Sequence, residues 1–179
     1  MGAKGYTLPD NYLKIPKKIN IAGEVLDRHV SEGNADKVAI YYEKEIITYG
    51  NLQESVNRFG NVLRKLEIGK GDRFIIRSEN CPEYIISVLG GMKIGAVPIP
   101  TNTLFRSWEL EHIINNSGSK IAFAQQNLVS PIQEVIDKCP TLEHVVLYDR
   151  AEKDQILLSD ILKDASTELE LVTTSSEDL

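Results

Sequence analysis

The chain has 179 residues, of which 42% are hydrophobic and 26% are charged, and its formal net charge is -6. This length suits one globular domain and is short for two, and the periodic grouping of the apolar residues predicts a buried core. The acidic balance argues against nucleic-acid binding, because a phosphate-binding protein normally presents a basic face. The longest apolar runs are far shorter than the roughly 18 residues that a membrane helix requires.

The N-terminal half predicts an arm, a helix, a hairpin and a long helix, in that order. Residues 1–19 contain two prolines and two glycines and predict an extended arm. Asn20 is a suitable N-cap for a short amphipathic helix that ends near Gly33. Residues 38–42 and 45–48 flank a polar pair and predict a two-stranded hairpin. Thr48 can cap the helix that follows, in which apolar residues recur at helical spacing as far as Leu66.

Residues 71–102 predict a strand, a helix and a second, parallel strand. Residues 74–76 form a short apolar run, and Pro82 suits the first turn of a helix. Gly95 stands where a left-handed C-cap belongs, and residues 96–99 form the next strand. Arg73 and Arg77 flank the first strand, and we expect them to form ion pairs with Asp72 or Glu79.

The remainder predicts further alternation of helices and strands. Ser107 can cap a helix that ends at Gly118. After it, the spacing of apolar residues predicts strands over residues 121–124 and 144–148, a helix over residues 129–136 and a short helix over residues 156–162. The polar residues 166–179 predict a linker or a frayed end. The expected fold class is therefore α/β, an open, mostly parallel sheet in residues 20–165 with helices on both faces and a peripheral N-terminal hairpin.

Motifs for catalysis or phosphate binding are missing from the sequence. It contains neither G-x-x-x-x-G-K-[ST] nor G-x-G-x-x-G, and Gly90 and Gly91 lie within a helix, where close packing is the preferred interpretation. Residues 78–82 offer acid and proline instead of glycine, which disfavours a flavodoxin-like or dinucleotide-binding domain. Cys81 and Cys139 have no CxxC spacing, so we expect reduced thiols, no metal site and a cytoplasmic protein. We predict no catalytic residue.

Several motifs together resemble the N-terminal portion of the adenylate-forming acyl- and aryl-CoA synthetases. The central stretch contributes GDR (71–73), NCPE (80–83) and KIGAV (93–97), followed by Pro100 and Asn102. ITYGNL (47–52) and NRFGNVL (57–63) resemble the start and continuation of a helix in this family. NIA (20–22) and NTL (102–104) are most similar to benzoate-, aminobenzoate- or medium-chain-acyl-CoA ligases. The resemblance covers roughly residues 18–150.

The resemblance implies one subdomain of a larger ligase that joins a carboxylic acid to coenzyme A (CoA) through an acyl-adenylate, with ATP and Mg²⁺. It places the phosphate loop, the acyl pocket and the catalytic lysine beyond Leu179, so we expect this chain alone to be inactive and to bind no cofactor tightly. The resemblance also suggests that Arg106 contacts the 3′-phosphate end of CoA, and solvation at the surface is the alternative. A different hypothesis is a non-catalytic folding or assembly module that forms homo-oligomers.

Overall fold

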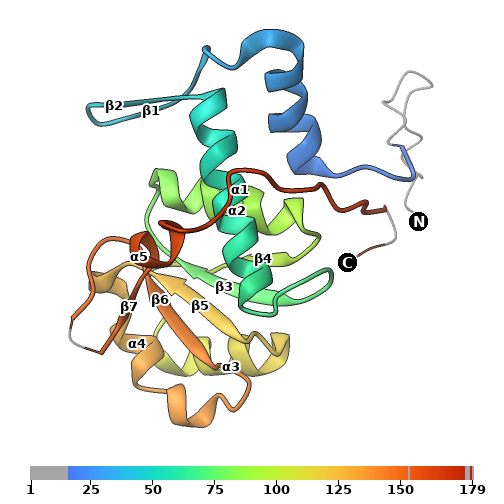
Figure 1. Cartoon of the computed structure of the whole chain (residues 1–179). Coiled ribbons are helices and arrows are strands. Elements are labelled where there is room, and N and C mark those ends of the chain that lie inside the picture. Colours follow the sequence, from blue (N-terminus) through green and yellow to red (C-terminus); the bar gives the residue numbers. More distant parts are fainter. Residues whose placement is uncertain (1–15, 153, 176–177, 179) are drawn as a thin grey trace, which may run out of the picture.

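A five-stranded parallel sheet forms the centre of the protein (Figure 1), in a computed structural model that describes residues 16–152, 154–175 and 178. The strand order is β4-β3-β5-β6-β7. The strands are β3 (Arg73–Arg77), β4 (Val97–Pro100), β5 (Ile121–Ala124), β6 (His144–Leu147) and β7 (Ile156–Leu157). Most of the predicted arm lies outside the described residues. The predicted α/β class, with a parallel sheet and a peripheral hairpin, is confirmed.

Helices cover both faces of the sheet, because each strand buries side chains on both sides. On one face, α1 (Tyr49–Lys65), α2 (Pro82–Lys93) and α5 (Leu158–Leu162) pack over an aromatic cluster of Phe59, Phe74, Phe123 and Tyr148. On the other face, α3 (Ser107–Ser117) and α4 (Ser130–Gln133) cover aliphatic residues of β3, β5 and β6. The connections of neighbouring strands therefore leave the sheet toward opposite faces.

The paired glycines of α2 permit the close approach that the sequence indicates. A Cβ at Gly90 would lie 2.8 Å from Cδ1 of Phe59 on α1, and a Cβ at Gly91 would lie 2.5 Å from Cε1 of Phe74 in the sheet. A side chain at either position would displace a buried aromatic ring. The interpretation that these glycines serve packing is confirmed.

The N-terminal helical segment is attached to α2 by polar contacts. It comprises η1 (Gly23–Asp27) and η2 (Val30–Asn34), both π-helical. Asn20 caps it as predicted, accepting hydrogen bonds from the backbone N–H groups of residues 22 and 23. The Asn20 amide also donates to the carbonyls of Met92, Lys93 and Val172, at 2.8–3.2 Å. This asparagine therefore joins three separate segments of the chain.

The predicted hairpin consists of β1 (Val38–Tyr42) and β2 (Glu45–Thr48), which project away from the sheet (Figure 1). Thr48 caps α1, as predicted, by accepting a hydrogen bond from the N–H of Asn51. Gly95 and Gly118 have φ angles of 76° and 64°, so both occupy the predicted left-handed position after a helix.

Three local predictions were wrong. The N-cap of α3 is Arg106, and Ser107 lies in the first turn, where its hydroxyl donates to Glu134, the residue that follows α4. The helix expected over residues 129–136 is shorter: α4 ends at Gln133, Val135 has a non-helical backbone, and η4 (Ile136–Lys138) follows it. A further turn, η3 (Gln126–Leu128), precedes α4, and Pro131 in the first turn of α4 cannot donate the hydrogen bond that would continue η3 into it. The short helix expected over residues 156–162 is present only from Leu158 as α5, because residues 156–157 pair with β6 as a strand.

The polar segment of residues 165–175, here called the C-terminal strap, is extended across α1 (Figure 1). Side chains of α1 donate hydrogen bonds to its main-chain carbonyls: Asn57 to residue 167, Arg58 to 165, Asn61 to 166 and 168, and Arg64 to 170, at 2.6–3.1 Å. The strap is therefore held along its length, and the expectation of a frayed end was wrong for residues 166–175. Its role as a linker to a further domain stays a prediction.

Candidate functional site

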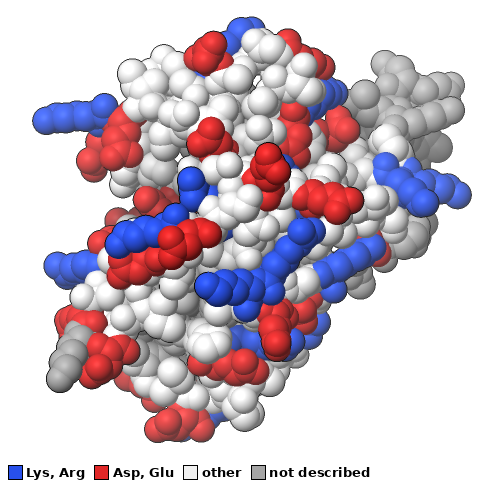
Figure 2. Space-filling view, in the orientation of Figure 1, with Lys and Arg blue, Asp and Glu red and all other residues white. Residues whose placement is uncertain are grey.

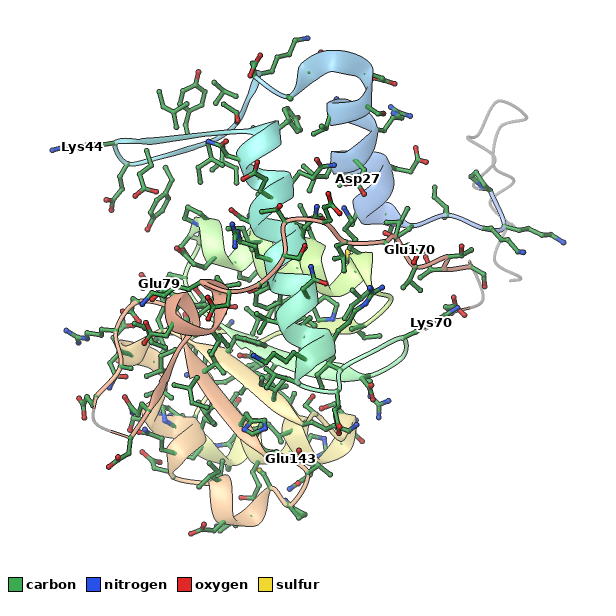
Figure 3. The ribbon with its side chains drawn as sticks, viewed as in Figure 1. Asp27, Lys44, Lys70, Glu79, Glu143 and Glu170 are labelled. Carbon is green, nitrogen blue, oxygen red and sulfur yellow. The ribbon has the colours of Figure 1, made fainter. Side chains whose placement is uncertain are left out.

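The carboxyl edge of the sheet is the part of this fold where a ligand is expected to bind. In open α/β sheets, ligands bind where connections from neighbouring strands leave toward opposite faces. Here β3 leads to α2 on one face, while β4 and β5 lead to α3 and α4 on the other. Figure 3 labels Glu79 at this edge and Glu143 at the opposite edge. The loops of interest are therefore residues 78–81, 101–106 and 125–129.

Arg77, the last residue of β3, organises this edge. Its side chain is among the largest fully buried ones, with 2% exposure. The guanidinium donates to four main-chain carbonyls at 2.7–3.1 Å: those of Asn102, Thr103, Phe105 and Leu128. Burial lowers the pKa of Arg77 and the nearby Glu109 partly offsets this, but a guanidinium stays charged in proteins. The predicted ion pair was wrong for Arg77, because strand burial leaves only loop carbonyls within its reach.

Arg73, at the other end of β3, also binds main-chain oxygen. Its Nε donates to the carbonyl of Ser117 at 2.7 Å and its Nη1 donates to the carbonyl of Gly71 at 3.0 Å. Among the described residues it has no ion pair, so the prediction for Arg73 was wrong too. The two arginines of β3 thus bind main-chain carbonyls at opposite edges of the sheet.

Two shallow depressions flank the loop of residues 101–105. One, of about 470 Å³, is bordered by polar residues of the loops after β3 and β4: Ser78, Glu79, Asn80, Thr101, Asn102 and Thr103. The other, of about 380 Å³, lies between α3 and α4 and is lined by Arg77, Thr103, Phe105, Arg106, Asn127 and Glu134, among others. Because Thr103 borders both, this loop forms the wall between them.

The loop after β3 carries a cysteine that is not suited to nucleophilic chemistry. Cys81 precedes α2, and its Sγ lies 3.2 Å from Oγ of Ser78. Burial raises the pKa of Cys81, and the contact with Ser78 offsets this only in part. A thiol with a raised pKa provides little thiolate at neutral pH.

The loop after β3 is also attached to the neighbouring strand. The N–H of Glu79 donates to Oε1 of Gln125 at 2.8 Å, which connects this loop to the end of β5.

Arg106 lies where the loop enters α3, with its side chain exposed and lining the smaller depression. Its backbone N–H donates to the Glu109 carboxylate at 2.8 Å, which fixes the start of the helix.

Among the described residues, no cluster of histidine, cysteine or acidic side chains could hold a metal ion. None of the helices in that part of the chain is long and apolar enough to cross a membrane.

The sequence prediction missed Arg77 as an organising residue. A signal for it does exist in the sequence. An arginine that ends a strand covered on both faces must be buried or turn away from the core, and at the carboxyl edge loop carbonyls are its nearest partners. The nearby acidic residues at positions 72 and 79 instead favoured ion pairing.

Comparison with known proteins places the chain in a family. A family model described as AMP-binding enzyme matches residues 26–179. The acetyl-coenzyme A synthetase of Bacillus subtilis (strain 168) is 33% identical over 169 residues, which cover 90% of this chain and 29% of that protein. The benzoate–CoA ligase of Thauera aromatica is 30% identical over 167 residues, with coverages of 93% and 31%. The chain thus spans less than a third of the length of these relatives.

Solved structures share the fold. The anthranilate CoA ligase AuaEII, in complex with anthranoyl-AMP, matches with a TM-score of 0.84 and 24% identity, covering 92% of this chain and 31% of that chain. A benzoate CoA ligase from Burkholderia xenovorans LB400 matches with a TM-score of 0.78 and 20% identity, with coverages of 89% and 31%. Since the family model matches most of the sequence, this chain belongs to the AMP-binding enzyme family.

Proposed function

We propose that this chain is the N-terminal part of an ATP-dependent acyl- or aryl-CoA synthetase. The overall reaction would convert a carboxylic acid, ATP and CoA into acyl-CoA, AMP and diphosphate through an acyl-adenylate. The observation that supports this most directly is the family match over residues 26–179, together with relatives named for acetate and benzoate. The identity of the acid and a cytoplasmic location stay predictions.

The loops of the carboxyl edge do not fit ATP and Mg²⁺. A triphosphate needs several free backbone N–H groups or cations, and Mg²⁺ needs carboxylates that converge. After β3 the chain offers Glu79 and Pro82, and the guanidinium of Arg77 is already bonded to four carbonyls. We therefore assign ATP and Mg²⁺ to parts of the relatives' length that this chain does not span. We also propose that these 179 residues alone do not adenylate an acid.

The contribution of this chain to binding would be a contact with CoA. Arg106 is exposed beside a depression of about 380 Å³, and a guanidinium can bind a phosphate through paired hydrogen bonds. Glu134 lines the same depression, but its carboxylate accepts hydrogen bonds from Ser107 and Ser130. These bonds reduce the repulsion that an incoming phosphate would meet.

Steady-state kinetics of the complete ligase, with a panel of acetate, benzoate, hydroxybenzoates and anthranilate, test this function. CoA- and ATP-dependent AMP release with at least one acid is expected. In the variant Arg106→Ala, the KM for CoA should rise while the KM for ATP stays constant. An unchanged KM for CoA would remove Arg106 from the site, and ATP consumption by the purified 179-residue chain would contradict its proposed inactivity.

A second candidate function, self-association, is favoured by the exposed hairpin. Tyr41 and Ile46 are cross-strand partners on β1 and β2, with exposures of 77% and 60%. The edge strand β4 is a poorer contact, because the N–H groups of Val97 and Thr101 point toward β3 and the alternate positions are prolines without an N–H. We propose that a second copy would pack on the hairpin. Light scattering should then show dimers that Tyr41→Ser abolishes, and a monomer at all concentrations would exclude this candidate.

A further inference from the structure

The environment of Arg77 is unusual for a buried cation. Its hydrogen-bond partners are neutral carbonyl oxygens, and no carboxylate of the described residues lies within ion-pair distance. Burying a charge is costly unless its hydrogen bonds are satisfied. Four charge-assisted bonds offset this cost only while the carbonyls converge on the guanidinium. The charge therefore selects one conformation of the surrounding loops.

Three of the four carbonyls belong to residues 102–105, in the loop between β4 and α3. Local contacts hold this loop weakly: Oδ1 of Asn102 accepts from the N–H of Leu104, and the N–H of Phe105 donates to the carbonyl of Asn102. Leu104 itself is 82% exposed, so apolar burial contributes little at the tip. The ends of the loop are fixed elsewhere, because Thr101 donates to the carbonyl of Ile76 and Phe105 packs against the core. Arg77 connects the residues between these two points to the sheet.

We propose that Arg77 is a positioning residue, which holds the β4–α3 loop so that Arg106 stands at the mouth of the depression with its guanidinium directed to a phosphate. This inference rests on the proposed function, because the ligand is the phosphate end of CoA. Lysine cannot replace Arg77: a guanidinium presents five donors in a rigid plane, whereas an ammonium presents three around one atom.

The purified 179-residue chain suffices for the test, with adenosine 3′,5′-bisphosphate as the probe. Amide hydrogen exchange by NMR reports the order of residues 104–106, and calorimetry at high probe concentration reports the weak binding that is expected of the probe. Arg77→Lys should accelerate exchange at these amides by about tenfold or more, which corresponds to the loss of one charge-assisted hydrogen bond. It should also weaken binding, while exchange in β5 stays within about threefold of wild type.

Arg73→Lys is the matched control, because Arg73 lies on the same strand and binds two main-chain carbonyls, of Gly71 and of Ser117 at the end of α3, at the opposite edge. It should leave both readouts unchanged. If Arg77→Lys does not fold, the wild-type side chain itself is observed: Arg77 should give separate, slowly exchanging Nη protons. Rapid averaging of these protons would overturn the inference.

Different results would contradict the positioning role of Arg77 and the phosphate contact of Arg106. Unchanged amide exchange at residues 104–106 in Arg77→Lys overturns the positioning role, regardless of the affinity of this variant for the probe. Arg106→Ala should abolish probe binding and leave the protection of the loop intact. If that variant binds the probe normally, the phosphate contact of the proposed function is wrong, and the inference that Arg77 positions Arg106 for a phosphate is overturned with it.

Discussion

Cδ2 of Leu169 occupies the space beside Gly60 where a Cβ would otherwise lie. The same relationship holds between Leu171 and Gly23, where a Cβ would lie 2.8 Å from the leucine Cδ2. Two glycines from separate helices therefore accept two apolar side chains of the C-terminal strap. The register of the strap is fixed by the fit of these two leucines against the glycines as well as by hydrogen bonds to the strap carbonyls.

Gly60→Ala should loosen the strap while strengthening α1. Alanine gains about 1 kcal/mol of helix stability over glycine. The new methyl group, however, must displace Leu169, and it also approaches the carbonyl oxygen of Gly90 at 3.3 Å. We expect little change in global stability but faster amide exchange in residues 168–172. In a Leu169→Ala background only the contacts at 3.3 Å with the Gly90 carbonyl oxygen and Cγ2 of Ile94 remain, so the same substitution should stabilise, by less than about 1 kcal/mol. Equal effects in both backgrounds would contradict this packing.

Asn61→Asp should destabilise the chain by about 1 kcal/mol, since two exposed hydrogen bonds are lost and a carboxylate faces carbonyl oxygens. The Asn61 amide donates to the carbonyls of Ser166 and Glu168 at 2.9 and 2.8 Å. Asn51→Asp is the control, because a negative charge in the first turn of the same helix is favourable. Urea unfolding compares the two variants, and a similar loss in both would argue against strap recognition by α1.

The elements that could be predicted from the sequence are those set by local chemistry. Residues 38–42, 45–48 and 121–124 are strands with the predicted bounds, since each is a short apolar run between turn residues. Asn20, Thr48 and Gly118 act as the caps that their residue types favour. Each of these outcomes depends on contacts within a few positions of the chain.

Contacts between distant segments could not be predicted in this way. The sequence of the strap is polar, which is typical of a frayed terminus. In the structure it is bound by α1, whose hydrogen-bonding residues lie more than 100 positions earlier in the sequence. Arg77 has acidic neighbours in sequence, but burial of its strand and the fold of two later loops determine its partners. The placement of Arg106 beside a depression follows from its position at a helix start, and its role stays a prediction.

Lys93→Ala should be strongly destabilising. Lys93 Nζ lies 2.6 Å from Oδ1 of Asp27, with the two side chains 3% and 24% exposed, and Figure 3 labels Asp27 on η1. Removing one partner of a buried ion pair costs about 3–5 kcal/mol, because the other charge is left without compensation. Here Gln53 also donates to Asp27, so we expect the lower end of this range.

Urea unfolding at two salt concentrations measures this loss. Lys163→Ala removes an exposed ion pair with Asp160, and should cost less than about 0.5 kcal/mol. The double variant Lys93→Met with Asp27→Leu should recover most of the stability that the single variant loses. A loss for Lys93→Ala as small as that for Lys163→Ala would mean that the buried pair does not attach η1 to α2.

The chain should lose stability at alkaline pH. Burial raises the pKa of Tyr148 far above its ordinary value, despite the hydrogen bond from its hydroxyl to Ser87, and burial also raises the pKa of Cys81. Both groups are neutral in the folded state, and their unfolded forms ionise at lower pH. Their stabilisation is therefore complete below the unfolded pKa values, about 8.5 for cysteine and about 10 for tyrosine, and is lost as pH rises above them.

Tyr148→Phe should remove most of the tyrosine part of this pH dependence. At neutral pH it should cost about 1 kcal/mol, because Ser87 loses its buried partner. Above about pH 10 the free energy of unfolding of the variant should fall less steeply with pH than that of the wild type, since phenylalanine cannot ionise in the unfolded state. Urea unfolding across the alkaline range measures both effects, with Tyr41→Phe as the control at a 77% exposed position. Parallel curves for Tyr148→Phe and the wild type would show that ionisation of this phenol does not drive alkaline unfolding.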